Sequence, residues 1–437
     1  MSYAVARLRN QNSDANKLYD EDRAIHEWYR FVLSFPPHLV RHYLERFGAH
    51  SGYRILDPFC GTATTLVECK KHGIEGVGIE GNPVAHFAGC VKTAWDVNPS
   101  ALVAEGQRIA EMAHEQLFLL GIQDEMPLLP TTSVDIALRT LPAEQAALIL
   151  TNSISPLPLH KALVLRDSIY QEAEPAYQRH LLLALIKALV NNASNLHFGP
   201  EVGLGAIKDD AAVIAPWFAN VQAMAQDISA FQDTQRIPSV IHRGDARSVA
   251  TILPERSIDC VITSPPYPNE KDYTRTTRLE AVFLGFIHNK SELRAMKKGL
   301  VRSNTRGVYK EDNDHEWIAN LPRIQELAER IEQRRIELGK TSGFERLYAR
   351  VTRLYFGGMA RHFAALRTSL VPGAKLAYVV GDQASYFRVM IRTGDILCDI
   401  AKSLGYHVLH VDLFRTRLAT ATREQMREEV VVLQWPG

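Results

Sequence analysis

The sequence lacks the features that mark several classes of protein. No apolar run approaches the length of about 18 residues that a membrane-spanning helix needs, and the first 21 residues, MSYAVARLRNQNSDANKLYDE, contain no apolar core of a secretory signal. Cysteine is scarce: the five cysteines share no Cys-x-x-Cys or Cys/His ligand spacing, so we expect neither a disulfide framework nor a zinc site. These absences favour a globular cytoplasmic protein without a membrane partner.

The chain also has little net charge, formally +1, but the charge is unevenly distributed. Residues 290–361 contain 16 Lys and Arg against 10 Asp and Glu, a net of +6, whereas residues 101–240 contain 8 against 15, a net of −7. Lysine and arginine dominate binding to nucleic acids because they neutralise phosphates. The later segment is therefore the better candidate for contact with a polyanion, although ordinary solvated helix faces explain the charges equally well.

Two stretches alternate between strand and helix patterns. In YRILDPFCGTATTLVECKKHGIEGVGIEGNP, a strand ending at Leu56, a helix over 64–72 and a strand over 77–79 form a βαβ unit. Far downstream, SIDCVITSPPY predicts a strand, 344–370 a helix, and AKLAYVVGD, HVLHVDLF and EEVVVLQW further strands. The pattern predicts an α/β fold with one doubly wound, Rossmann-like sheet.

Large insertions are expected to interrupt this sheet. Residues between the two α/β stretches are mostly helical in pattern, and a second insertion combines the polar loop RSNTRGVYKEDND with the charged helix RIQELAERIEQRRIEL. We expect five segments along the chain: 1–98, an N-terminal helix and the first part of the sheet domain; 99–238, a helical insertion; 239–287, the next part of the sheet domain; 288–343, a basic helical and loop insertion; and 344–437, the C-terminal part of the sheet domain.

The first chemical constellation lies where the βαβ strands end. Asp57 follows the first strand in DPFCGT, where Gly61 allows close approach of the backbone to a ligand. Glu80 ends the second strand, 23 residues after Asp57, near the offset of about 20 residues at which an acidic residue binds ribose hydroxyls in such folds. A tight turn followed by a surface glutamate is the structural alternative.

The second constellation is TSPPY, which ends the strand of the later α/β stretch. Pro265 and Pro266 stiffen the loop and remove two N–H donors while leaving carbonyl acceptors. Ser264 adds a hydroxyl acceptor, and Tyr267 adds a flat apolar face. Such a group fits a planar base with an exocyclic amino group, whereas a proline-rich turn with a packed tyrosine is the simpler alternative.

Together these motifs resemble the amino-group DNA methyltransferase family. TSPPY is similar to the catalytic motif of that family, and DPFCGTATT to its S-adenosylmethionine motif, with Ala63 where glycine is more usual. GIEGNP is similar to the ribose-binding segment, GDARS at 244–248 to the segment beside the cofactor adenine, and WYRFVLSFPPHLV at 28–40 to the segment at the methionine end. The resemblance covers about 24–98 and 238–437, and it implies the methyltransferase form of the doubly wound sheet.

The resemblance assigns a role to each matching residue. It implies a catalytic group of Ser264, Pro265, Pro266 and Tyr267. It implies that S-adenosylmethionine is held by Phe35, Pro36, Asp57, Pro58, Phe59, Gly61, Thr62, Glu80, Asn82, Asp245 and Ala246. No metal ion is implied. We expect DNA contacts from EKDYTRT and from RSNTRGVYK, namely Asp272, Tyr273, Arg275, Arg302, Arg306 and Lys310, although a salt-bridged surface loop and plain disorder are equal alternatives for these two stretches.

The implied activity is site-specific methylation of double-stranded DNA at the N4 atom of a flipped-out cytosine, with a cognate restriction or defence-system subunit as a further partner. Ser264 favours cytosine, because the family more often has Asp or Asn at this position for adenine N6. Adenine methylation is the first alternative. RNA guanine-N2 methylation and a catalytically idle nucleic-acid-binding subunit are the others, but an RNA enzyme would usually carry an additional domain before the sheet, and an idle subunit would not need both Tyr267 and Glu80.

Overall fold

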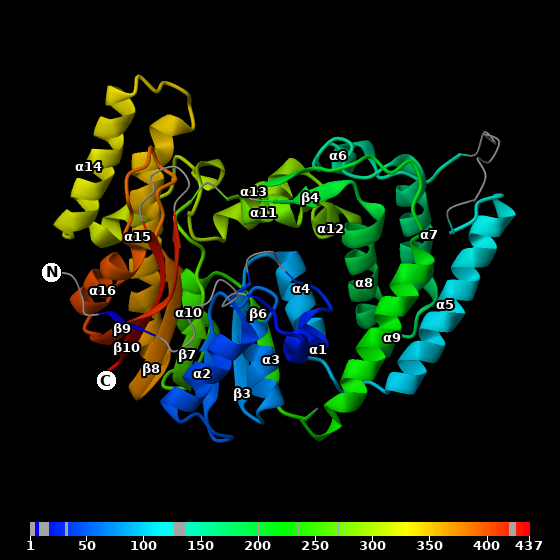
Figure 1. Cartoon of the computed structure of the whole chain (residues 1–437), viewed down its shortest axis with the longest axis horizontal. Helices are drawn as coiled ribbons and strands as arrows, with labels where there is room; N and C mark the ends of the chain where they lie inside the picture. Colours follow the sequence, from blue (N-terminus) through cyan, green and yellow to red (C-terminus); the bar gives the residue numbers. More distant parts are fainter. Residues whose placement is uncertain are drawn as a thin grey trace.

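The computed structural model describes residues 5–7, 17–30, 34–125, 137–199, 201–234, 236–269, 271–418 and 425–437. Its centre is an eight-stranded sheet with the order β1-β9-β10-β8-β7-β2-β3-β6 (Figure 1). Along the chain the strands are β1 (Val5–Arg7), β2 (Arg54–Asp57), β3 (Glu75–Glu80), β6 (Ser239–Arg243), β7 (Ile258–Thr263), β8 (Leu370–Gly381), β9 (His407–Leu418) and β10 (Gln425–Gln434). All neighbouring pairs are parallel except those of β10, which runs antiparallel to β8 and β9. The doubly wound α/β class expected from the sequence is confirmed.

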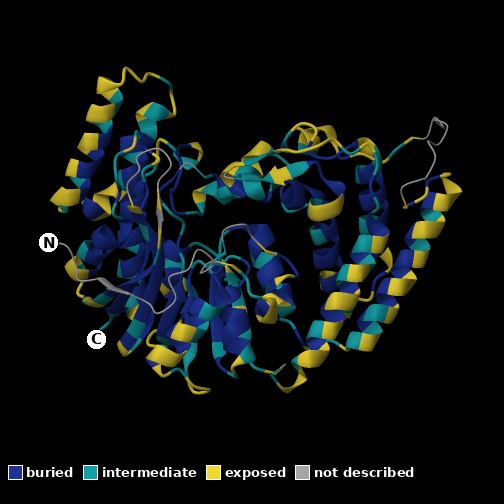
Figure 2. Cartoon of the chain, viewed as in Figure 1, coloured by how far each residue is buried: buried dark blue, intermediate teal, exposed yellow. Residues whose placement is uncertain are grey.

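Both faces of the sheet are buried, so its strands are apolar throughout rather than alternating with polar residues. Ile55 packs into a cluster with α2 (Pro37–Phe47), whereas its neighbour Leu56 packs into a cluster with α15 (Tyr348–Leu366) and α16 (Thr393–Ser403) on the opposite face. The same division separates Ile262 from Val261 in β7. Figure 2 shows the sheet between buried helix faces, with the outer faces of the helices exposed.

Further helices complete the two layers and the connections. They are α1 (Arg23–His26), α3 (Thr64–Lys71), α4 (Pro83–Lys92), α10 (Val249–Ile252), α11 (Tyr273–Thr276), α12 (Arg278–Phe283), α13 (Lys290–Lys298) and α14 (Pro322–Glu337). None of the helices within the described ranges has the length and apolar character needed to cross a bilayer. Within the same ranges, no group of His, Cys, Asp and Glu side chains has an arrangement that could hold a metal ion.

The helical insertion, residues 99–238, stands beside the sheet with a core of its own (Figure 1). Its helices are α5 (Pro99–Leu119), α6 (Ala143–Ala146), α7 (Pro156–Glu172), α8 (Pro175–Ala188) and α9 (Ile214–Ala230). Between α8 and α9 it also forms a feature that the sequence patterns did not predict, an antiparallel hairpin of β4 (Leu196–Phe198) and β5 (Val202–Leu204). This hairpin shares no strand pairing with the central sheet.

The stretch RSNTRGVYK was expected to be an open polar loop, but the structure packs its first half firmly. The residues from Val301 to Thr305 are all buried. Arg302 holds this segment, because its guanidinium pairs with Asp312 at 2.8 Å and donates to the carbonyl oxygens of Lys297, Lys298 and Leu300. Only the later part, including Arg306 and Lys310, is exposed.

Candidate active site

The carboxyl ends of the parallel strands meet at one edge of the sheet, and a cavity of about 630 Å³ lies there. The chain proceeds from β2 to β3 and β6 on one side, and from β7 to β8 on the other, so the strand order reverses between β2 and β7. Open α/β sheets bind ligands at such a switch point. The segment after β2 and the TSPPY segment after β7 both line the cavity, although they are far apart in the sequence.

Asp57 connects these two segments from below the cavity. Its carboxylate accepts hydrogen bonds from the hydroxyl of Thr263 at 2.5 Å, the hydroxyl of Thr65 at 2.7 Å and the backbone N–H of Phe59 at 3.1 Å. The side chain is completely buried, and burial raises the pKa of Asp57 to about 6 although these donors oppose the rise. Asp57 therefore fixes the end of β7, immediately before Ser264, relative to the start of α3.

Glu80 ends β3 and lines the cavity itself. One carboxylate oxygen accepts from the backbone N–H of Gly61 at 2.9 Å, and the other accepts from the N–H of Asn82 at 2.7 Å. Burial raises the pKa of Glu80 to about 7, despite these two hydrogen bonds. Each oxygen keeps a lone pair for a further donor, so the carboxylate can accept from two neighbouring hydroxyl groups.

The turn between β2 and α3 explains why glycine is the usual residue at the position of Ala63. Ala63 has a φ of 66°, in the left-handed region that an alanine adopts at a cost of about 1 to 2 kcal/mol. Gly61 also has a positive φ, 51°. The turn packs directly on β3, because a Cβ atom at Gly78 would lie 2.7 Å from the Cys60 sulfur. The backbone of this turn can therefore approach a ligand closely.

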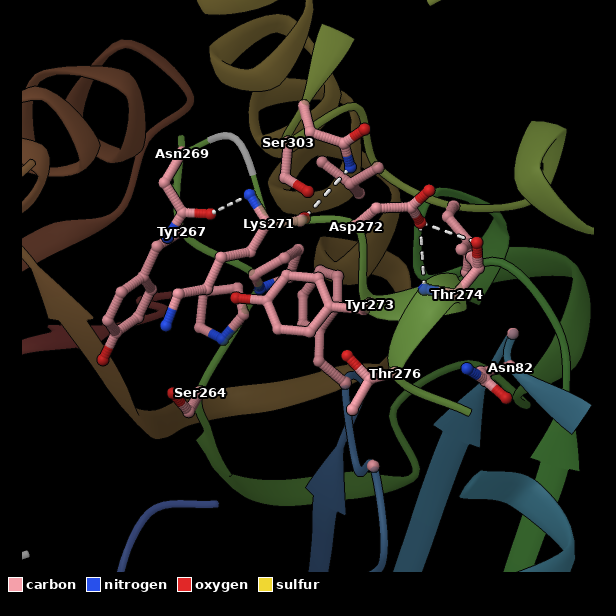
Figure 3. A pocket seen from close by; sticks show the side chains of 18 of the residues that line it. Asn82, Ser264, Tyr267, Asn269, Lys271, Asp272, Tyr273, Thr274, Thr276 and Ser303 are labelled. Carbon is pink, nitrogen blue, oxygen red and sulfur yellow. Dashed lines mark hydrogen bonds between the residues drawn. The ribbon is translucent and has the colours of Figure 1, made fainter. Parts of the chain in front are cut away.

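The TSPPY segment presents a hydroxyl group and an aromatic ring to the same cavity (Figure 3). The Ser264 hydroxyl donates to the carbonyl oxygen of Val379 at 3.2 Å, which leaves its lone pairs as acceptors. The Tyr267 ring packs against Gly381 at the end of β8, where a Cβ atom would lie 3.0 Å from the ring. Its hydroxyl bonds to Ser264, and burial raises the pKa of Tyr267. The ring is thus held at its edge, beside the serine.

The structure brings most of the expected site residues together. The cavity is lined by Phe35, Pro58, Phe59, Gly61, Thr62, Glu80, Asn82, Asp245, Ala246, Ser264, Pro265, Pro266, Tyr267, Asp272, Tyr273, Arg275 and Arg302. Pro36, Asp57, Arg306 and Lys310 are outside the described lining of this cavity. Pro36 instead caps α2, and Asp57 lies beneath the cavity floor.

Two of the expected cofactor ligands are strongly engaged with the protein. The Asn82 carbonyl oxygen accepts from the N–H groups of Val84 and Ala85 and caps α4, while its amide group donates to Thr277. Asp245 forms an ion pair with Arg247 at 2.6 Å. These two side chains shape the cavity wall by holding the turns after β3 and β6.

The expected DNA contacts divide in a similar way. Asp272 accepts from both the N–H and the hydroxyl of Thr274 and pairs with Lys297 at 2.7 Å. Arg302 is only 4% exposed and is paired with Asp312. Both geometries disfavour a direct role in binding a phosphate or a base. Tyr273 and Arg275 are half-buried in the cavity wall.

The motifs missed two contributors to the cavity. Lys271 lies in the sequence EKDYT, and its side chain extends into the space near Tyr267 and Tyr273 (Figure 3). Its backbone is fixed by Asn269 at 3.0 Å and by Asn304 at 3.1 Å. The second contributor is the β4–β5 hairpin, through Phe198, Gly199, Glu201 and Val202. The hairpin comes from the helical insertion, and no motif in the sequence connects it to TSPPY.

Comparisons with known proteins agree with these motifs. No family model matches the chain. The type II methyltransferase M.BsoBI of Geobacillus stearothermophilus is 25% identical over 453 residues, which cover 95% of this chain and 85% of that protein. M.AvaI of Nostoc sp. (strain PCC 7120) is 25% identical over 441 residues, which cover 94% and 86%. M.MjaII of Methanocaldococcus jannaschii is 36% identical over 64 residues, only 15% and 12% of the two chains.

Among solved structures, TrmN from Thermus thermophilus matches 94% of this chain and 52% of its own, with 10% identity and a TM-score of 0.31, a similarity too low to bear on function. The sequence relatives have a different weight, because they match nearly the whole chain and are all type II methyltransferases. Together with the motifs gathered around one cavity, they identify the family. The chain belongs to the amino-group DNA methyltransferases.

Proposed function

We propose that this protein transfers a methyl group from S-adenosylmethionine to the exocyclic N4 of a cytosine flipped out of double-stranded DNA. The observation that carries the proposal is the convergence of the Glu80 segment and the TSPPY segment on one cavity at the switch point of the sheet. A restriction endonuclease that cuts the same DNA site is the partner that this activity implies.

The residues around the first strands fit S-adenosylmethionine. Glu80 offers two acceptor oxygens for the ribose hydroxyls, and the turn at Gly61 leaves room for close approach. The cavity volume lies within the range of about 300 to 1,000 Å³ that is typical of ligand pockets. When bound there, S-adenosylmethionine supplies an electrophilic methyl group on its sulfonium.

The residues after β7 fit a flipped base. Ser264 Oγ and the Pro265 carbonyl oxygen accept hydrogen bonds from an exocyclic amino group, and this direction of bonding favours a pyramidal nitrogen with its lone pair free for the methyl group. The Tyr267 ring stacks on the base and returns about 1 to 3 kcal/mol toward the cost of flipping. Positioning supplies most of the catalysis.

The transfer needs no covalent bond between the enzyme and the base. Cys60 and Cys260 lie nearest to the two motifs in the sequence and are both buried. Burial raises the pKa of the Cys260 thiol to about 12 and raises that of Cys60 strongly as well. Both thiols are therefore protonated at neutral pH, and neither is a nucleophile, because only the thiolate attacks.

Two features favour cytosine over adenine. Ser264 is the family residue more usual for cytosine, and Lys271 places an ammonium donor in the cavity wall. Cytosine carries two acceptors beside its amino group, N3 and the carbonyl O2, whereas the corresponding edge of adenine has N1 and no carbonyl. A lysine donor suits the first pattern better. Adenine methylation is the outcome that would reassign the base.

Substitution of Tyr267 tests this function. We expect Tyr267→Ala to lower kcat/KM for DNA methylation by at least about 5- to 150-fold, the equivalent of 1 to 3 kcal/mol of lost stacking. Affinity for S-adenosylmethionine should be preserved, as measured by calorimetry without DNA. Tyr267→Phe keeps the ring and should retain most of the activity. Normal turnover of Tyr267→Ala would contradict the assignment of this pocket.

A further inference from the structure

The β4–β5 hairpin is the part of the helical insertion that reaches the active-site cavity. Phe198 and Val202 line this cavity, together with Ser264 and Tyr267. Figure 1 shows β4 beyond the carboxyl ends of β3 and β6, on the side of the cavity away from the sheet. The hairpin therefore approaches the site from the direction opposite the strands.

The base of the hairpin is rigidly attached to the insertion through Asn195, which is 2% exposed. The Asn195 amide group donates to the carbonyl oxygen of Asn152 at 2.9 Å and to the Ser155 hydroxyl at 3.1 Å. Its two carbonyl oxygens, of the side chain and the backbone, accept from the N–H groups of Lys208 at 2.8 Å and Gly205 at 2.7 Å. Both ends of the hairpin are thus tied to the start of α7.

One face of the hairpin is entirely apolar. Leu196 pairs with Leu204 and Phe198 with Val202, so these four side chains lie on the same face, because directly opposed residues in an antiparallel pair share a side. The other face has the exposed His197 and Gly203, where a Cβ atom would meet nothing within 4 Å. Leu204 is 43% exposed, so the apolar face is only partly covered by the protein.

An isolated two-stranded hairpin is marginally stable in water, and an uncovered apolar face on such a hairpin indicates a binding surface. A ribbon of two strands fits the major groove of DNA, which is about 12 Å wide, and apolar side chains support distortion of a duplex when they pack against unstacked bases. The surface is continuous with the cavity that takes the flipped base in the proposed function. These properties select duplex DNA as the occupant.

We propose that the β4–β5 hairpin enters the DNA beside the target base and that Phe198 packs against the bases next to the vacated position, which favours the flipped state. This role rests on the proposed function. It gives the helical insertion a direct part in base extrusion, although the insertion as a whole is acidic. The contact is apolar, so it adds little to the salt dependence of binding.

The test uses the full chain and two duplexes that carry its methylation site, one with the target cytosine paired to guanine and one with it opposite an abasic position. Flipping is easier from the second duplex, because no base pair must be broken. We expect Phe198→Ala to lower kcat/KM by about 10-fold on the paired duplex and by less than about 2-fold on the abasic one. Phe198→Trp keeps a ring and should behave like the unaltered protein.

Phe118→Ala is the matched control. Phe118 is a phenylalanine of the same insertion, 76% exposed at the end of α5, and it is not part of the described cavity lining. Equal losses for Phe198→Ala on both duplexes would overturn the proposal, as would a loss of S-adenosylmethionine affinity, which would make the hairpin a cover for the cofactor. An unaltered protein that methylates neither duplex would refute the proposed function itself, and the role of the hairpin with it.

Discussion

The affinity for the methyl donor should depend on pH through Glu80. Burial raises the pKa of Glu80 to about 7 in the free protein, compared with 4.5 for an ordinary glutamate. Ribose hydroxyl groups donate to the ionised carboxylate, so a bound nucleoside stabilises the charged form and lowers its pKa. Affinity should therefore rise with pH through 7 and fall as the carboxylate becomes protonated below it.

The size of this effect follows from linkage between binding and ionisation. If only ionised Glu80 binds, the apparent Kd is the intrinsic Kd multiplied by one plus the ratio of protonated to ionised protein. With a pKa of about 7, that factor is about 11 at pH 6 and about 1.1 at pH 8. The Kd for the methyl donor should thus be about tenfold higher at pH 6 than at pH 8.

Calorimetric titration of the DNA-free protein at pH 6, 7 and 8 measures this dependence directly. Glu80→Gln should bind more weakly at pH 8 and show a nearly flat profile. Glu280→Gln is the control, because burial also raises the pKa of Glu280 to about 7, but Glu280 bonds to Tyr29 and lies outside the described cavity lining. A profile that stays steep in Glu80→Gln, or becomes flat in Glu280→Gln, would refute the assignment of Glu80 to the ribose.

Three further substitutions test how the site is supported. Gly381→Ala places a methyl group 3.0 Å from the Tyr267 ring and should lower kcat for methylation while the Kd of the methyl donor is unchanged; unaltered kcat would show that the ring position is not critical. Thr263→Val removes a donor to the buried Asp57 and should lower the free energy of unfolding by about 1 to 3 kcal/mol, as measured with urea; an unchanged midpoint would argue against this link between the motifs. Arg302→Ala leaves Asp312 without its partner and should destabilise the protein by about 3 to 5 kcal/mol, whereas Arg306→Ala, at an exposed position, should leave stability unchanged; a reduced salt dependence of DNA binding without destabilisation in Arg302→Ala would return Arg302 to the DNA interface.

The convergence of the motifs could be predicted from sequence because it depends on strand direction alone. Asp57, Glu80 and Ser264 each end or follow an apolar strand, and the carboxyl ends of parallel strands lie at one edge. The apolar periodicity located the strands, and the glycine-containing turn after Asp57 located the ligand side. The doubly wound class followed from the same alternation.

The orientation of individual side chains could not be predicted in this way. Asp57 was expected at the ligand, but its neighbours Thr65 and Thr263 supply donors that hold it below the cavity. Arg302 has the composition of a DNA contact, but Asp312 is close enough to pair with it and draw it inward. In both cases the outcome depends on which nearby partner offers the better hydrogen bonds, and strand patterns carry no information on that choice.

The part played by the helical insertion was equally hidden. Its hairpin strands are three residues each, too short to give a clear alternating pattern. Their place beside TSPPY depends on how α7, α8 and α9 pack against one another, which is a property of the whole insertion. The sequence NLHFGPEVG shows a Gly-Pro turn between apolar residues, and that was the available signal.

The central claim is tested most directly by the chemical identity of the product. The purified protein is incubated with isotopically labelled S-adenosylmethionine and duplex DNA of mixed sequence, and the DNA is digested to nucleosides for mass spectrometry. We expect labelled N4-methyldeoxycytidine, absent from the same reaction with Tyr267→Ala. Labelled N6-methyldeoxyadenosine in its place would contradict the choice of base, and the absence of any labelled nucleoside would contradict the proposed function.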